Sequence, residues 1–406
     1  MAEENGNDLL TAVFQADKLS GTYQQYAVPS AKIYIGKPAQ ELVQAAGVQI
    51  ESIRVSLNLD AAASAELSVT NIWDDQKNAV KEGVKSQLVC GAMIRIELGY
   101  GSELTDVFHG FIYETGMQFS DMPSMQVTVM DVKRLMADNS EIDRVWEEQT
   151  LSSLFSTLMG RYEAFGLSIS TEQKDSTIKS FIQRGSDLNL VRKLCREQSL
   201  RFVVYGEKAK LVSKSEEASV LTLSWGKNLI SFSKNNNFVN TEIVVRGTLE
   251  KPAQKNSSDV PGGESQGAPS GGPGNAGGSS SAGGGTGGGQ AEESGQKNAV
   301  IEKRESVLSD GAAGTGIAKS IKVIEMTNVK GEDEVTSRLD DEVESLKESM
   351  DSGRGSCIGM PVLIPGRYLS IGGIDQSVDG DYYIKAVSHT FGSDGFTTDF
   401  TLGGKK

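Results

Sequence analysis

The side chains most able to do acid–base chemistry gather near the C-terminal end of the sequence. The segment GDYYIKAVSHTFGSDGFTTDFTLGG (380–404) contains His389, one of two histidines in 406 residues. The polar residues close to it are Ser388, Ser393, Asp394 and Asp399. A serine, a histidine and an aspartate within hydrogen-bond reach can activate a hydroxyl nucleophile. The alternative is a pair of strands that carries a histidine for structural reasons.

The pattern of residues 382–389 favours the structural alternative. Successive side chains of a strand point to opposite faces, so Ser388 and His389 would diverge. Gly392, Ser393, Asp394 and Gly395 have the composition of a turn. The second histidine, His109, lies in a matching strand-like segment, and the sequence has neither an H-E-x-x-H motif nor a nucleophile elbow at a strand-to-helix turn. We predict a structural role for both histidines and no catalytic residues.

Composition excludes several other classes of function. The net charge of −14 and the scattered Lys and Arg residues argue against nucleic-acid recognition. Cys90, Cys195 and Cys357 are too far apart for a zinc site or a disulfide framework, which is consistent with folding in a reducing cytoplasm. The acidic segment 332–342 lacks the ligand spacing of a calcium loop. We therefore expect no metal site.

The sequence also gives no sign of export or membrane insertion. The N-terminus is acidic and lacks the basic start and apolar core of a secretory signal. No apolar run approaches the roughly 18 residues that span a bilayer. We expect a protein that assembles in the cytoplasm, without a signal peptide, and that is not an integral membrane protein.

Residues 252–296 form a Gly- and Ser-rich segment that interrupts the chain. It holds too little apolar surface to offset the entropy of ordering it, so we predict a flexible, exposed insertion. Gly272, Gly274 and Gly277 match a dinucleotide-binding spacing, but no strand precedes them and no helix follows. In the phosphate-loop-like segment 311–320, Lys319 comes two residues too late to reach a phosphate. We expect no cofactor.

Periodicity divides the remainder into three parts after an N-terminal extension, 1–27. Residues 28–137 alternate at period two and predict a first tube-like β-barrel. Residues 138–235 add helical intervals and predict a small α/β domain, with the option that its end returns to the first barrel. Residues 236–406 return to strands around one acidic helix, Asp333–Met350, and predict a second barrel that contains the insertion. The predicted class is mainly β (α+β).

A weak internal repeat supports two related barrels. GAMIRIELGY followed by HGFIYETGMQFSDMPSMQVTVMD is similar to GMPVLIPGRYLSIGG followed by GDYYIKAVSHTFGSDGFTTDFTL. In each copy a glycine-led strand precedes a hairpin whose turn contains Ser-Asp. Two barrels that flank an α/β domain account for this order.

The same strings resemble the phage late-control protein D family. The second copy of the repeat looks like the C-terminal signature of that family. FIQRGSDLNLVRKLCREQSLRFVVYGEKAKLV resembles its central segment, in which a Gln and a Ser-Asp pair precede a helix and two strands. VFHGFIYETGMQF...VTVMDVKRLM is similar to its first-barrel strands, in which an Asp at the position of Asp131 precedes the next helix. The family comprises central hubs of contractile tail baseplates, and the N-terminal part of type VI secretion VgrG proteins is related to it.

The resemblance implies a homotrimer whose two barrels per subunit form a pseudo-sixfold ring. Such a ring adapts the hexameric tail-tube protein above it to a trimeric spike below. Because no needle follows the second barrel, the spike is expected to be a separate protein, and other baseplate or LysM-like components are possible partners. The particle would be a contractile phage tail or a phage-tail-like injection system.

A tail-tip protein that binds or cleaves the cell wall is the alternative function. Related tip proteins carry hydrolase modules, and any two of the 54 acidic residues could converge on a glycosidic bond. Glu342 is one candidate acid. Muropeptide release that is lost on substitution of Glu342 would favour this alternative.

Overall fold

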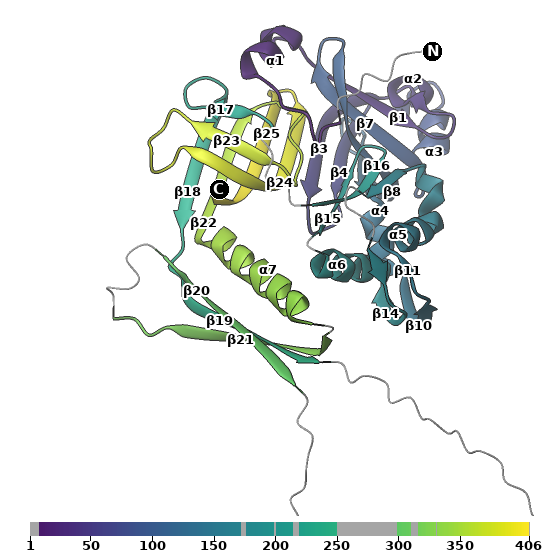
Figure 1. Ribbon diagram of the computed structural model, residues 1–406. Helices are drawn as coiled ribbons and strands as arrows, with labels where there is room; N and C mark the ends of the chain where they lie inside the picture. Colours follow the sequence, from purple (N-terminus) through teal and green to yellow (C-terminus); the bar gives the residue numbers. More distant parts are fainter. Residues whose placement is uncertain are drawn as a thin grey trace, which may run out of the picture.

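The computed structural model describes residues 8–171, 176–198, 200–213, 219–249, 299–309, 316–329 and 331–405. The predicted insertion, 252–296, lies outside these residues, as does the start of the predicted N-terminal extension. Strands outnumber helices along the described chain, which confirms the predicted mainly β (α+β) class (Figure 1). The predicted domain boundaries stay a prediction, because strand pairing does not by itself delimit folding units.

One large sheet forms the centre of the molecule. Its strands follow the order β18-β22-β25-β24-β3-β4-β9-β8-β7-β1-β2, and β23 and β17 join it beside β24. The bounds are β1 (Pro29–Ile35), β2 (Gln40–Glu41), β3 (Gln49–Asn58), β4 (Ser64–Thr70), β7 (Met93–Tyr100), β8 (Glu103–Gln118), β9 (Ser124–Met130), β17 (Thr222–Ser224), β18 (Leu229–Asn236), β22 (Asp351–Ile358), β23 (Tyr368–Gly372), β24 (Gly380–Gly392) and β25 (Gly395–Lys405). The sheet therefore contains strands from both halves of the sequence repeat.

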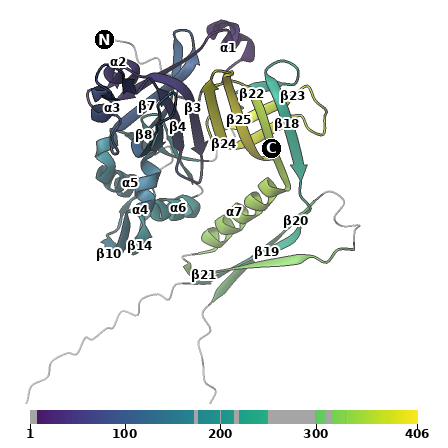
Figure 2. The ribbon, with the colours of Figure 1, turned by 180° about the vertical axis from the view of Figure 1, so that it is seen from behind.

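The two halves meet at an antiparallel pair of strands far apart in sequence. Residues 386–391 of β24 lie opposite residues 53–58 of β3 (Figure 2). One hydrophobic core runs beneath both halves. Within it the Tyr100 and Phe396 rings lie 5.6 Å apart, and the Tyr100 hydroxyl donates to the Gly359 carbonyl at 3.1 Å. Strand pairing and a shared core thus join the halves into one body.

Short helices and ribbons cap the first half of the sheet. They are α1 (Ala16–Thr22), η1 (Gln24–Tyr26), α2 (Leu42–Ala46), β5 (Trp73–Asp74), β6 (Ala79–Val80) and α3 (Glu82–Gln87). The segment before α1 is tied to the second half, because Arg367 donates to the carbonyl oxygens of Leu9 and Ala12 at 2.6 and 3.0 Å. The N-terminal segment therefore packs against strands that lie far along the chain.

A small α/β unit follows the first half and has its own hydrophobic core. Its elements are α4 (Val132–Asp138), β10 (Ser140–Trp146), β11 (Gln149–Thr150), α5 (Leu151–Met159), η2 (Gly160–Phe165), β12 (Ser168–Thr171), β13 (Thr177–Ile178), β14 (Phe181–Ser186), α6 (Asp187–Glu197), β15 (Leu200–Tyr205) and β16 (Lys208–Ser213). The sequence predicts an N-cap at Ser186 or Asp187, and the structure shows it at Ser186, whose hydroxyl accepts from the Asn189 amide at 3.3 Å.

The strands next to the insertion form a separate three-stranded sheet. β19 (Asn240–Leu249) lies between β20 (Val300–Leu308) and β21 (Ser320–Val329), and α7 (Glu332–Met350) packs on one face (Figure 1). α7 matches the predicted helix within one residue. Val335, Leu339 and Val343 are buried against the sheet, as their spacing indicates. The sequence pattern did not distinguish this sheet from the second barrel.

Gly110 on β8 provides a test of the packing of the large sheet. A Cβ added there would lie 2.3 Å from the Met130 carbonyl oxygen, a backbone atom that cannot move alone. We expect Gly110→Ala to destabilise the protein by about 1–3 kcal/mol, because overpacking forces the strands apart. Gly116→Ala on the same strand is the matched control, since a Cβ there meets nothing within 4 Å. Thermal unfolding checks both variants, and equal midpoints would contradict the expectation.

Candidate functional site

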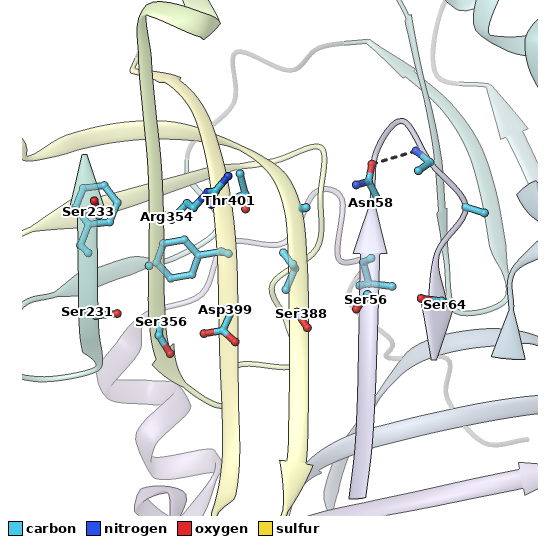
Figure 3. A pocket seen from close by; sticks show the side chains of 18 residues that line it. Ser56, Asn58, Ser64, Ser231, Ser233, Arg354, Ser356, Ser388, Asp399 and Thr401 are labelled. Atoms are coloured by element: carbon cyan, nitrogen blue, oxygen red, sulfur yellow. Dashed lines mark hydrogen bonds between the residues drawn. The ribbon is translucent and has the colours of Figure 1, made fainter. Parts of the chain in front are cut away.

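The serine, histidine and aspartate near the C-terminus do not converge. Ser388 lies opposite Asp399 across the β24–β25 hairpin, and His389 lies opposite Thr398. Ser388 and Asp399 line a hollow on one face of the sheet (Figure 3). His389, the next residue along β24, is completely buried on the other face. The prediction that Ser388 and His389 point to opposite faces is confirmed. The predicted turn is confirmed too, because β24 ends at Gly392 and β25 begins at Gly395.

Both ring nitrogens of His389 have structural partners. Nε2 lies 3.2 Å from the Leu363 carbonyl oxygen, which can only accept, so Nε2 carries the proton. Nδ1, 2.9 Å away, accepts from the Thr398 hydroxyl, which itself accepts from the Met360 amide at 2.9 Å. Burial lowers the pKa of His389 to about 4. The imidazole is therefore a neutral bridge between the hairpin and the loop before β23.

His109 lies on β8 in the first half of the sheet and is also buried. Its Nδ1 lies 3.7 Å from Glu207 Oε1, and burial lowers its pKa. Among the described residues, no group of His, Cys, Asp and Glu side chains has an arrangement that could hold a metal ion. In that same part of the chain, no helix is long and apolar enough to cross a membrane.

The face opposite His389 carries a row of small polar side chains that spans both halves of the sheet. The register places these residues side by side on successive strands: Ser231, Ser356, Asp399, Ser388, Ser56 and Ser64. Figure 3 shows them in this order on β18, β22, β25, β24, β3 and β4. We call this surface the polar face. It crosses the β24–β3 junction without interruption.

Neighbouring rows of the polar face carry paired charges and hydroxyls. Arg54 lies between Thr390 and Glu66, and Glu66 lies opposite Thr128. In the row on the other side Arg354 lies between Ser233 and Thr401. The centre of the face is a hollow of about 630 Å³. Hydroxyl groups together with positively and negatively charged side chains make a hydrated surface. This surface offers no deep pocket and no cluster of catalytic groups.

The Gln and the Ser-Asp pair of the predicted central segment organise the α/β unit. The Asp187 carboxylate is fully buried and accepts from Gln183 at 2.8 Å, Tyr162 at 2.8 Å and Arg161 at 2.9 Å. Gln183 accepts in turn from the Trp146 indole at 2.8 Å. The buried charge is thus paired and hydrogen-bonded on all sides. We assign these residues a structural role, which the sequence pattern did not reveal.

Asp131 likewise holds the unit against the large sheet. It caps α4 by accepting from the Lys133 amide at 3.0 Å, and burial raises its pKa to about 6. The Lys133 ammonium is buried and donates to the carbonyl oxygens of Asn58 and Leu59, at 3.0 and 3.1 Å. This lysine satisfies the backbone at the end of β3, so the α/β unit and the junction strand are fixed together.

Two other residues singled out in the sequence lie in ion pairs. Glu342 on α7 pairs with Lys322 of β21 at 2.6 Å, which ties the helix to the three-stranded sheet, and with Arg338 one turn earlier in α7. Lys319 lies 3.7 Å from Glu242. Gly311, the first glycine of the phosphate-loop-like segment, lies outside the described residues. Neither Glu342 nor Lys319 lies on the polar face.

Removal of the Asp187 carboxylate should unfold the α/β unit at lower denaturant concentration. Asp187→Ala leaves the Arg161 guanidinium and several donors without their buried acceptor, so we expect a loss of about 3 kcal/mol. Asp143→Ala removes the exposed ion pair with Arg184 and should cost less than about 1 kcal/mol. Chemical denaturation followed by tryptophan fluorescence compares the two. A similar small loss in both variants would contradict the assigned role.

The lowered pKa of His389 predicts how the stability of the protein depends on pH. The folded state binds this proton only near pH 4, whereas the unfolded chain binds it near pH 6.5, so stability falls as the pH falls from about 6.5 to 4. The full effect is roughly 3 kcal/mol. The half-buried Asp106 and the buried Asp131, with raised pKa values of about 7 and 6, act in the opposite direction. The measurement is therefore a difference between wild type and His389→Gln.

Two observables check the His389 statement. NMR of histidine-labelled protein should show the ring neutral down to pH 5, with the signal assigned by its absence in His389→Gln. The stability difference between wild type and variant should shrink as the pH falls below 6.5. An imidazole that titrates near pH 6.5 would refute the account of its burial.

Comparison with known proteins shows which fold this is. The tail protein from Neisseria meningitidis MC58 superposes with a TM-score of 0.63 at 9% identity, over 93% of this chain and 96% of that one. The 43 kDa tail protein of prophage MuSo2 from Shewanella oneidensis gives 0.59 at 13% identity, over 92% and 98%. The E. coli c3393 protein, a component of the type VI secretion system, gives 0.52 at 12%, over 88% and 74%.

These likenesses establish that the chain has the fold of phage tail proteins and of a type VI secretion component. The narrower resemblance to the late-control protein D family stays a prediction. No curated protein matches the chain in sequence. One protein family, described as the Alg8 N-terminal domain, matches residues 32–245, which is more than half of the chain. The protein belongs to the Alg8 N-terminal domain family.

Proposed function

We propose that the protein is a structural hub in the baseplate of a contractile phage tail or of a phage-tail-like injection system. The observation that carries the proposal is the polar face, a single sheet surface that runs across both halves of the chain. The fold shared with the tail proteins supports the same assignment. A continuous hydrated wall suits a channel through which other proteins pass, because it offers them no apolar patch to stick to.

In this proposal three copies form a ring with the polar face toward its centre. Each copy supplies two related four-stranded units, β3-β4-β9-β8 and β18-β22-β25-β24. Three copies with two similar units present nearly sixfold symmetry, while the rest of each chain repeats threefold. One side of the ring would match a hexameric tail-tube protein, and the other a separate trimeric spike protein. The ring would assemble in the cytoplasm and then form part of the particle.

The role would be structural and not enzymatic. The tail neighbours point to an architectural component, and the candidate serine, histidine and aspartate lie on two faces of the sheet. Glu342, the candidate acid of the alternative cell-wall function, contributes to the packing of α7. No observation favours cleavage of the cell wall over a role in assembly.

Native mass spectrometry and sedimentation of the full chain test the hub proposal. We expect the trimer mass for the protein with its tube and spike proteins present, and a complex that contains all three components. The tube and spike proteins mixed without the hub are the control and should stay apart. A hub protein that remains a monomer and joins neither component would contradict the proposal.

A further inference from the structure

Two of the strand edges of the large sheet that have no neighbour among the described residues lie on β18 and β8. β18 ends the sheet and pairs only with β22. In β8, residues 103–111 pair with β7, whereas residues 114–118 pair with β9 alone and Tyr113 falls in a register shift. The exposed side chains along these edges include Tyr113, Met117 and Ile230. Open edges of this length template pairing with another chain, so proteins rarely leave them uncovered.

The internal repeat relates these open edges to the paired edges at the junction. Met117 lies opposite Met125 beside one hairpin turn, and Phe391 lies opposite Phe396 beside the other. Counting along each ladder from these pairs makes β8 equivalent to β24, β9 to β25, β4 to β22, and β3 to β18. By this count Glu114 corresponds to Ser388, and Ser233 corresponds to Ser56.

The β24–β3 pairing within the chain thus indicates how the equivalent strands of two copies could pair. β24 pairs with β23 up to residue 383, and beyond that point its residues 386–391 pair with β3. β8 parts from β7 after residue 111 in the same way, but on that side residues 114–118 have no partner strand in the described part of the chain. We propose that residues 113–118 of β8 pair antiparallel with β18 of a second copy, with Glu114 opposite Ser233 and Gly116 opposite Ser231.

The side chains at this proposed seam are compatible. Glu114 would lie on the polar face beside Ser233 of the second copy, one strand from its Arg354, since Ser233 lies opposite Arg354. The two charged residues would be roughly 10 Å apart at the backbone, within their combined reach. Met117, 43% exposed, would meet the 52% exposed Ile230 where the junction inside the chain pairs Phe391 with Ile53. The seam therefore covers apolar surface and pairs opposite charges.

This inference rests on the hub proposal and names the surface through which its copies would join. The test is a cysteine pair, Glu114→Cys with Ser233→Cys, in the full chain with exposed Cys90 changed to Ser. Directly opposite residues of antiparallel strands have Cα atoms about 4.5–5.5 Å apart, which allows a disulfide. We expect mild oxidation to give covalent oligomers up to the closed trimer, which a thiol reverses.

A matched pair checks the register. Thr128 lies opposite Glu114 on β9, one strand farther from the seam, so Thr128→Cys with Ser233→Cys places the sulfurs out of range. This variant should stay free of cross-links while it assembles normally. Trimers by native mass without a cross-link in the Glu114/Ser233 variant would overturn the seam and leave the hub proposal standing. A wild type that stays monomeric with tube and spike would overturn both.

Charge reversal gives a reading that does not depend on a disulfide. Glu114→Arg alone, or Arg354→Glu alone, should weaken self-association by up to about fivefold, since like charges on directly opposite residues cost at most about 1 kcal/mol and this pair lies one strand farther apart. The double variant should recover the affinity of wild type, and unchanged thermal midpoints would show that each variant folds. Association that neither single reversal weakens, or that the double variant fails to restore, would argue against the register.

Discussion

The pairing of β24 with β3 is the interaction on which the rest of the structure depends. It joins residues more than 300 positions apart, and it turns two four-stranded units into one sheet with one core beneath it. Long-range pairing of this kind needs a strongly specified register, because a shift by one residue would exchange the buried and exposed faces. His389 and Thr398 fix the register of β24 on its hairpin partner β25, since both lie in the core and hydrogen-bond to each other.

The two faces of the joined sheet serve different purposes. The buried face holds aliphatic and aromatic side chains together with the neutral His389, whereas the polar face is lined by serines, threonines and scattered charges. The α/β unit stiffens this arrangement from outside, because Lys133 binds the backbone at the end of β3. A wall that is smooth, hydrated and fixed in curvature is what a channel through a baseplate would require.

Much of the fold could be predicted from sequence because it follows from local periodicity. The alternation of residues 382–389, the turn at 392–395, the cap at Ser186 and the spacing of α7 each depend on nearby residues, and each is present in the structure. The polar face could not be found this way. The polar face arises from the register between six strands spread over the chain. Each of these strands contributes at most two serines to it, so no single strand reveals the face.

The same limit explains the other omissions. Asp187 reads as a helix-start residue in the sequence, but its role comes from Arg161, Tyr162 and Gln183, which only the fold brings together. The separate sheet β19–β20–β21 has the same period-two pattern as barrel strands, so pairing partners alone distinguish it. Periodicity determines which residues form strands, whereas long-range packing determines which strands meet.

The central claim is that the two units of each chain alternate around a channel with the polar face inside. A cryo-EM map of the protein assembled with its tube and spike tests this most directly. The account predicts a threefold ring in which six four-stranded units line the opening, with Ser56, Ser388 and Asp399 facing it. A ring whose channel is lined by other elements, with these residues on the outer surface, would contradict it.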